Sequence, residues 1–345
     1  MILSHGRITG VIDSYNHNFI KVLKSTLDNK YSYNIYKIKN GRIYSDTVTD
    51  TAFILNNKVV KGPTFQHRHP KNAQIFENIV FQKGTPKFQK NLKGNIFSLL
   101  TGGAGNANYW HWMFDVLPRL KILESKINLN EIDYFLFPAL KKKFQIETIN
   151  YLNIPEKKRI SSITFRHIQT DMAIAVDHPY VFENNPSVEI QNLPMWILDY
   201  LRNKFLNKVN SKKFLTKFYI DRKDSNHNHI RKIINEDEIK EYLISKGFSI
   251  ISLSDLDFED QVNLFSNATQ IVGLHGAGFA NLTFCNPKTL ALELKPVGAG
   301  PVIGNLSKKL NLNYQDISVE PLEHSKNNQQ GFIKIPLNLL EKKLS

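Results

Sequence analysis

The sequence lacks the features that mark disulfide-stabilised, membrane-spanning and repeat proteins. Its one cysteine, Cys285, cannot form an internal disulfide, and its apolar neighbours predict a buried, inert thiol in a reducing compartment. No run of about 18 apolar residues occurs, and the first residues lack the basic and apolar regions of a signal peptide, so we expect a cytoplasmic protein. No Pro/Gly/Ser tract or repeat of fixed period is present, so disorder should be confined to short loops and the termini.

Acidic residues are also scarce relative to basic ones, which gives the 345 residues a formal net charge of +14. Such a charge favours anionic partners: nucleic acid, an acidic glycan, a nucleotide diphosphate or the inner face of an anionic membrane. The lysines are scattered along the whole chain. This distribution favours a solvated basic surface over a nucleic-acid site, and peripheral membrane contact stays a candidate.

The length predicts two domains, and the pattern of apolar residues divides the chain accordingly. Residues 20–61 alternate as short strands and hairpins, and α/β segments follow. From 209 onward strands alternate with helices, which predicts a parallel, doubly wound sheet. After a helix near 193–206 we place the boundary in a lysine-rich linker, giving an N-terminal acceptor-side domain (1–208), a C-terminal donor-binding domain (209–330) and a tail (331–345) that packs back on the N-terminal domain.

A glycine-rich loop follows the strand QIVGL and leads directly into a helix. Glycines let a phosphate approach the backbone, and the start of a helix favours an anion. The spacing matches neither the dinucleotide fingerprint nor the Walker loop, which weakens nicotinamide and ATP hypotheses. Tight packing of a strand-to-helix turn is the competing explanation. The loop consists of His275, Gly276, Ala277 and Gly278.

Charged residues accompany this loop at the predicted carboxyl edge of the sheet. Arg222 follows one strand, and Arg231 opens a helix; both are expected to bind phosphate, with surface ion pairing as the alternative. Glu293 ends the next strand and is expected to accept hydrogen bonds from ribose hydroxyls. Asp255 and Asp257 have a spacing that suits either a divalent metal or a helix cap, and the cap is favoured. The histidine-rich pieces at 67–69 and 227–229 lack a metal framework, so no metal site is predicted.

A helix predicted over 108–125 carries the densest polar stripe of the chain, although Pro118 should kink it. His111 and Asp115 stand four residues apart, so they can form a hydrogen bond that raises the basicity of the imidazole. They are the candidate general base and its partner, and a purely structural His–Asp pair is the alternative. Asn108, Arg119 and, beyond the glycine loop, Asn281 are further candidates for substrate binding.

Four segments, taken together, resemble the signature blocks of glycosyltransferase family 61. They are NYWHWMFDVLPRL, FYIDR, RKIINEDEI and IVGLHGAGFANLTFCNPKTLALELKP. The resemblance implies a GT-B architecture, with two facing Rossmann-like domains, parallel sheets and a β-rich N-terminal extension. It further implies inverting transfer from a nucleotide sugar in the synthesis of bacterial capsular or surface polysaccharide. Asp221 departs from the pattern, because a small hydroxyl residue is frequent before the arginine.

The sequence therefore predicts a glycosyltransferase that needs no cofactor besides its nucleotide-sugar donor, with a glycan or lipid-linked glycan as acceptor. His111 would take the acceptor proton, with Asp115 or His275 as alternatives, while the glycine loop and the arginines hold the diphosphate. Two other hypotheses stay open. One is a non-catalytic module that binds acidic glycan or nucleic acid. The other is a nucleotide-sugar oxidoreductase that uses the loop Gly103-Ala104-Gly105, which lacks a third glycine.

Overall fold

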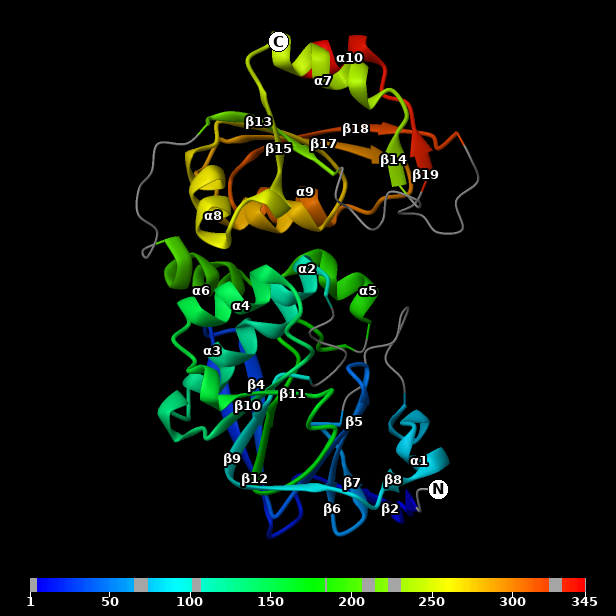
Figure 1. Cartoon of the computed structure of the whole chain (residues 1–345), viewed down its shortest axis with the longest axis vertical. Coiled ribbons are helices and arrows are strands. Elements are labelled where there is room, and N and C mark those ends of the chain that lie inside the picture. The colour runs from blue at the N-terminus through cyan, green and yellow to red at the C-terminus, as the bar shows by residue number, and fades with distance from the viewer. Residues whose placement is uncertain are drawn as a thin grey trace. The chain divides into compact units, whose positions relative to one another are not determined.

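The structure, a computed structural model, divides into two compact units, residues 1–200 and 201–345 (Figure 1). It describes residues 5–64, 74–100, 107–183, 185–206, 215–222, 231–322 and 331–344. The units divide within helix α6 (Met195–Phe205), whereas the sequence placed the boundary after residue 208.

The first unit is built on a large mixed sheet, in the strand order β11-β10-β9-β12-β5-β6-β7-β2, with β4 also paired to β12 and β3 paired to β4. The strands are β2 (Gly10–Ile12), β3 (Ile20–Leu27), β4 (Tyr31–Lys39), β5 (Arg42–Thr47), β6 (Asp50–Leu55), β7 (Lys58–Val60), β9 (Lys90–Ser98), β10 (Tyr134–Phe137), β11 (Arg159–Ser161) and β12 (His167–Val176). A separate two-stranded sheet pairs β1 (His5–Gly6) with β8 (Thr85–Pro86).

Only part of this large sheet is Rossmann-like, which corrects the expectation of a parallel sheet in both domains. Strands β11, β10, β9 and β12 run parallel, whereas β12 pairs antiparallel with β4 and β5. The β-rich start adds further antiparallel pairs, β3 with β4 and β6 with β7. Asp28 and Asn29 have positive φ in the turn between β3 and β4, and Asn56 and Asn57 have positive φ in the turn between β6 and β7. Short turns of this kind join strands that pair antiparallel.

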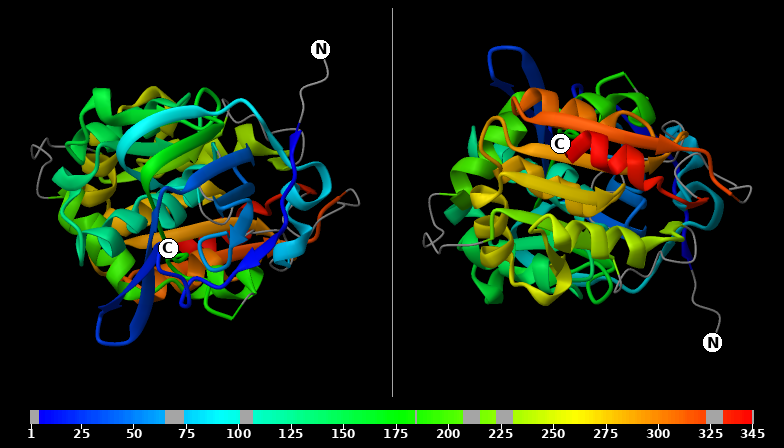
Figure 2. Two further views of the ribbon diagram at one scale, coloured as in Figure 1. Left: turned by 90° about the horizontal axis from the view of Figure 1, so that it is seen from below. Right: turned by 90° about the horizontal axis from the view of Figure 1, so that it is seen from above.

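Helices cover this sheet and complete the core of the first unit. They are α1 (Val80–Lys83), α2 (Tyr109–His111), α3 (Pro118–Glu124), α4 (Lys143–Tyr151) and α5 (Pro186–Glu189). The α3 helix packs against β12 and β4. Ile38, Phe53 and Ile96 are fully buried in a hydrophobic cluster formed by side chains of the strands. The β3–β4 hairpin extends beyond the rest of its unit (Figure 2).

The second unit contains the predicted parallel, doubly wound sheet, in the order β15-β13-β16-β17-β18. Its strands are β13 (Lys217–Asp221), β15 (Ser249–Ser252), β16 (Gln270–Leu274), β17 (Leu290–Pro296) and β18 (Asn313–Val319). Helices α7 (Glu236–Ser245) and α10 (Leu337–Leu344) lie on one face, and α8 (Phe258–Asn267) and α9 (Val302–Lys309) lie on the other (Figure 1). The chain crosses over between β13 and β16, and doubly wound sheets bind ligands at this switch point.

The C-terminal tail corrects a second expectation, because it packs on the second unit. Strand β19 (Gly331–Ile333) pairs with β14 (Arg231–Ile233). Ile333, Ile335 and Leu340 are fully buried in the core of this unit. Burial removes these apolar side chains from water, which stabilises the tail on the core of the second unit.

Cys285 and the apolar character of the helices remain to be compared with the expectations from the sequence. Cys285 is 1% exposed, and burial raises the pKa of its thiol, as an inert cysteine requires. Within the ranges described above, no helix is both long and apolar enough to cross a bilayer.

Candidate active site

In each unit the ring Nδ1 of a histidine meets a buried carboxylate, and a tyrosine hydroxyl donates to the same carboxylate. The first triad is His111, Asp115 and Tyr180. The second triad is His275, Glu293 and Tyr314. The sequence analysis named the histidines and the carboxylates as candidates, but neither tyrosine.

The first triad stands on an irregular helix whose interruption was expected from Pro118. Asn108 caps its start, because its side-chain oxygen accepts from the backbone N–H of Trp110 at 2.9 Å. Residues Trp112–Val116 form a π-helical turn, and α3 begins at Pro118. Such turns are frequent at functional sites. Substrate binding by Asn108 stays a prediction, and its observed role is that of a cap.

Asp115 is the centre of the first triad. Its Oδ2 lies 2.8 Å from His111 Nδ1, so the predicted hydrogen bond is present. Tyr180 donates to Oδ1 at 2.7 Å, and His178 Nε2 lies 3.8 Å from Oδ2. With Nδ1 donating to Asp115, a neutral His111 has its lone pair on Nε2, as a general base needs.

The two side chains shift each other's pKa in opposite directions. Burial lowers the pKa of His111, but the charge and hydrogen bond of Asp115 raise it more, so the pKa lies above its ordinary value. Burial raises the pKa of Asp115. The charges and hydrogen bonds of His111 and His178 lower it by more, so the pKa of Asp115 lies well below its usual range. The side chain of His111 is 28% exposed and that of Asp115 is 1% exposed, so only the histidine can meet a substrate.

Arg119 lies beneath this triad rather than in contact with solvent. Its Nε donates to the backbone carbonyl of Asp115 at 2.7 Å, and the side chain is fully buried. Neither Nη atom has a hydrogen-bond acceptor within the described part of the chain. Burial lowers the pKa of Arg119 to about 10, against the opposing charge of Asp115. Direct substrate binding by Arg119 stays a prediction, and its observed contact is with the turn that carries Asp115.

His178 and Tyr180 escaped the sequence analysis, although a signal was present. Both follow directly after β12, a buried strand that pairs in parallel with β9. Polar residues at the carboxyl end of a parallel strand are candidates for a site. The segment His178-Pro179-Tyr180 would have satisfied that criterion.

In the second unit the glycine loop lies at the switch point of the sheet, after β16. Gly276 has an extended backbone, and a Cβ there would lie 3.2 Å from Arg222 Nη1. A Cβ on Gly278 would lie 2.9 Å from Leu253 Cδ1. Packing therefore accounts for part of the glycine content. A 3₁₀ helix, Ala277–Phe284, begins within the loop, so its first N–H groups have no acceptor inside the helix.

Two arginines converge on this loop. Arg222 Nη1 donates to the carbonyl of His275 at 2.9 Å, and Arg231 Nη1 donates to the same oxygen. Burial and then the charge of Arg222 lower the pKa of Arg231 to about 10. The expected convergence of both arginines is present, but Arg231 stands on β14 and not at a helix start. The backbone of β14 pairs with β19, and α7 begins only at Glu236.

Glu293 is fully buried behind the loop, and its partners differ from the ribose expected from the sequence. One oxygen contacts His275 Nδ1, and the other accepts from the Tyr314 hydroxyl at 2.5 Å. Lys295 Nζ lies 3.7 Å from the latter oxygen. Contact with ribose stays a prediction. Asn281 is likewise buried, and its amide donates to Gln261 Oε1 at 3.0 Å.

The remaining candidates are a helix cap, a metal site and segments outside the described residues. Asp257 caps α8 by accepting from the backbone N–H of Asp260 at 2.8 Å, as favoured from the sequence. No group of three or more His, Cys, Asp or Glu residues suited to a metal occurs in the described segments. The histidine-rich pieces at 67–69 and 227–229 and the loop at 103–105 lie outside the described residues.

Comparison with known protein families identifies a match. The family model for Glycosyltransferase 61 matches residues 109–292, a little over half of the chain. This span contains His111, Asp115, both arginines and the glycine loop. No curated protein matches the chain significantly.

Proposed function

The chain belongs to glycosyltransferase family 61, and from this membership we propose that the enzyme moves a sugar from a nucleotide-sugar donor to a hydroxyl group of a growing glycan. As a glycosyltransferase it is an enzyme, so a purely non-catalytic binding module is set aside, as is an oxidoreductase. Capsular or surface polysaccharide is the proposed product class, and the cytoplasm is the proposed location.

The observation that carries the donor assignment is the convergence of Arg222 and Arg231 on the carbonyl of His275. Two guanidinium groups around one oxygen concentrate positive charge at the switch point of a parallel sheet. Like charges repel, and a diphosphate bound there would relieve that repulsion while gaining charge-assisted hydrogen bonds. The first N–H groups of the 3₁₀ helix add further donors for an anion.

The proposed reaction is a single displacement with inversion. His111 Nε2 takes the proton of the acceptor hydroxyl, and the acceptor oxygen forms a bond to C1 of the donor sugar. The bond from C1 to the phosphate oxygen breaks, and its electron pair leaves with the nucleoside diphosphate. Arg222 and Arg231 stabilise the negative charge that develops on the leaving group. Asp115 keeps His111 in the required tautomer.

We propose a GT-B type of enzyme, with the donor on the second unit and the acceptor chemistry on the first. The supporting observation for the second unit is its five-stranded parallel sheet with the glycine loop at the switch point. For the first unit it is the partly exposed side chain of His111 next to a buried carboxylate.

A donor screen tests the proposal. Purified protein is incubated with a panel of nucleotide sugars, and mass spectrometry follows the release of nucleoside diphosphate and of free sugar. We expect hydrolysis of one donor class, and its loss in the variant His111→Ala. If no nucleotide sugar is consumed and none raises the melting temperature, the proposal is wrong.

The same screen tests the proposed metal independence. Two arginines and a helix start supply the positive charge that a divalent cation would otherwise provide. Donor consumption should therefore persist in excess chelator. Loss of turnover with chelator, restored by added manganese, would contradict this part of the proposal.

A further inference from the structure

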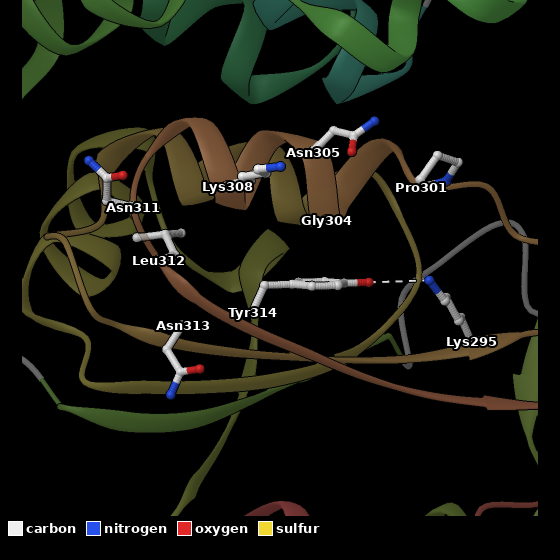
Figure 3. Close-up of a pocket in the computed structure, with 9 residues that line it drawn as sticks. All are labelled: Lys295, Pro301, Gly304, Asn305, Lys308, Asn311, Leu312, Asn313 and Tyr314. Carbon is white, nitrogen blue, oxygen red and sulfur yellow. Dashed lines mark hydrogen bonds between the residues drawn. The ribbon is translucent and has the colours of Figure 1, made fainter.

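Each triad has a buried cation beside it, and the two cations differ in what they contact. Lys295, which is 9% exposed, accompanies the second triad. Its Nζ donates to the Tyr314 hydroxyl oxygen at 3.2 Å (Figure 3) and lies 3.3 Å from Asp316 Oδ2 and 3.7 Å from Glu293 Oε2. The charge of the lysine is therefore matched by oxygens of its own triad and of Asp316. Arg119, which is 0% exposed, accompanies the first triad.

The guanidinium group of Arg119 has fewer partners than the lysine. Its Nε donates to the backbone carbonyl of Asp115 at 2.7 Å. Nη1 and Nη2 are both buried, and neither has a hydrogen-bond acceptor among the described residues. The charges that act on the group are those of Asp115, Tyr180 and Asp177. Because a buried donor without an acceptor costs free energy, Arg119 needs an explanation other than stability.

The charge of Arg119 needs that explanation more than its hydrogen bond does. A donor to the carbonyl of Asp115 could equally come from a neutral amide side chain such as that of glutamine. Burial lowers the pKa of Arg119 to about 10, so the group still carries its proton at neutral pH. A fully buried charge is unfavourable unless neighbouring groups interact with it. The first triad therefore lies in the field of a permanent positive charge.

A positive charge at this place opposes protonation of His111. Burial lowers the pKa of His111, and the Asp115 carboxylate, 2.8 Å from Nδ1, raises it by more. A histidine whose pKa is too high is an imidazolium at working pH and cannot accept a proton. The charge of Arg119 repels that imidazolium and offsets part of the attraction of Asp115. His111 should therefore be neutral over a wider pH range than the His–Asp pair alone would allow.

The other titratable groups near this triad cannot replace the charge of Arg119. They are Asp177, His178 and Tyr180 after β12, Tyr36 on β4 and Glu189 on α5. Burial raises the pKa of both tyrosines, so they stay neutral. Asp177 and Glu189 are negative when ionised, which favours a protonated imidazole. Among these groups, and within the described residues, Arg119 alone is a permanent cation.

We propose that Arg119 is a positioning residue that acts through Asp115 and keeps His111 in its neutral, proton-accepting form. The inference rests on the proposed function, because it takes His111 to be the general base. Nε of Arg119 holds the π-helical turn that carries Asp115, and its charge limits how strongly the carboxylate attracts a proton to His111. This role needs no contact with a sugar, as suits a fully buried side chain.

Three substitutions of Arg119 test the inference. Arg119→Gln keeps a hydrogen-bond donor and removes the charge, Arg119→Met removes both, and Arg119→Lys keeps the charge. In the two neutral variants the acidic limb of kcat/KM should move to higher pH by about one unit, so kcat/KM measured below the limb should fall about tenfold. Arg119→Lys should leave the limb close to its original pH.

NMR titration of the His111 ring measures the same effect without turnover. Its signal is assigned by its absence in His111→Ala, and its pKa should rise in both neutral variants of Arg119. Thr148→Val is the matched control, because the fully buried Thr148 accepts a hydrogen bond at 2.9 Å from Trp112 Nε1 of the same π-helical turn. This variant should lower the melting temperature and leave the acidic limb in place, since no charge is removed.

The outcomes separate this inference from the proposed function. The role of Arg119 is overturned if neither the limb nor the NMR titration moves in folded neutral variants, or if Thr148→Val or Arg119→Lys shifts them equally. It is also overturned if both neutral variants fail to fold while Arg119→Lys folds, because the charge would then serve folding. If the NMR titration moves but the limb does not, the electrostatic role stands and His111 is not the base. If no nucleotide sugar is consumed, the proposed function fails, and the NMR titration still decides whether Arg119 controls the protonation of His111.

Discussion

The two triads contain the same three kinds of group, and they differ in how far the histidine can reach. In the first triad the His111 side chain is 28% exposed, whereas in the second the His275 side chain is 6% exposed. The carboxylates are equally hidden, at 1% and 0%. A partly exposed imidazole beside a buried carboxylate can exchange a proton with a substrate. A buried imidazole cannot do so as readily, and its hydrogen bond to the carboxylate instead holds the backbone of its own loop in place. We therefore propose that the first triad carries out the chemistry and that the second positions the glycine loop.

The triads also differ in construction. His111 and Asp115 come from one helical segment, four residues apart, and Tyr180 joins them from the end of β12. His275, Glu293 and Tyr314 come from three neighbouring parallel strands or their ends. The first arrangement is local and the second depends on sheet register. Mutations in the first should therefore change rates, and mutations in the second should change donor affinity and folding.

The sharpest test replaces each histidine in turn. His111→Ala should lower kcat by about 10²–10⁴-fold with little change in nucleoside diphosphate affinity, because it removes the general base. His275→Ala should chiefly weaken nucleoside diphosphate binding, because it removes the group that holds Glu293 at the glycine loop. Steady-state kinetics and calorimetry on both variants separate the two effects.

The opposite pattern would reverse the comparison. If His275→Ala abolishes turnover at saturating donor while His111→Ala retains it, the second histidine is the base. The variant His17→Ala, in the exposed loop before β3, is a suitable control because it removes an imidazole outside both triads.

The next largest effect is expected in the pH profile of Asp115→Asn. A general base must be neutral, and Asp115 raises the pKa of His111, so the rate of the unmodified enzyme falls as pH drops below that raised value. Asparagine cannot supply the charge, and burial then favours the neutral ring. The acidic limb of kcat/KM should move to lower pH, and kcat should fall about tenfold to a hundredfold. An acidic limb that does not move would mean that His111 is not the titrating base.

The sequence predicted the second unit in more detail than the first. Strict alternation of apolar strands and amphipathic helices from Lys217 to Val319 specifies a parallel sheet, and that sheet is present. In the first unit, hairpin turns at Asp28 and Asn56 join antiparallel strands, and β12 also pairs antiparallel with β4 and β5, so the sheet is mixed. The short strand at Arg231 could not be predicted, because its partner β19 lies a hundred residues further along.

The same distinction holds for the candidate sites. The bond between His111 and Asp115 was predictable because a helix brings i and i+4 together. The bond between Tyr314 and Glu293 was not, because it requires the register of β17 against β18. Burial of Glu293 was equally hidden, since a glutamate at the end of a strand can face solvent or the core.

A smaller effect is expected from the arginines of the second unit. Arg222→Ala should weaken nucleoside diphosphate binding about tenfold, because it removes one charge-assisted hydrogen bond, with kcat at saturating donor less affected. Lys232→Ala is the matched control, since it removes an exposed positive charge next to Arg231 on β14. Calorimetry measures both affinities. Equal affinities in Arg222→Ala and the unmodified enzyme would remove the phosphate role and leave Arg222 as a support of the loop.

The smallest effects, and the finest test of the comparison, come from the two tyrosines. Tyr180→Phe and Tyr314→Phe each delete one hydrogen bond to a buried carboxylate, so each should lower the free energy of unfolding by about 1.5–3 kcal/mol. Their functional effects should separate: Tyr180→Phe should lower kcat severalfold and leave nucleotide affinity unchanged, whereas Tyr314→Phe should weaken nucleotide binding and spare kcat. Denaturant unfolding, kinetics and calorimetry measure the three quantities. If both variants lower kcat alike, the second triad takes part in the chemistry, and its buried histidine must reach the reacting atoms after a conformational change.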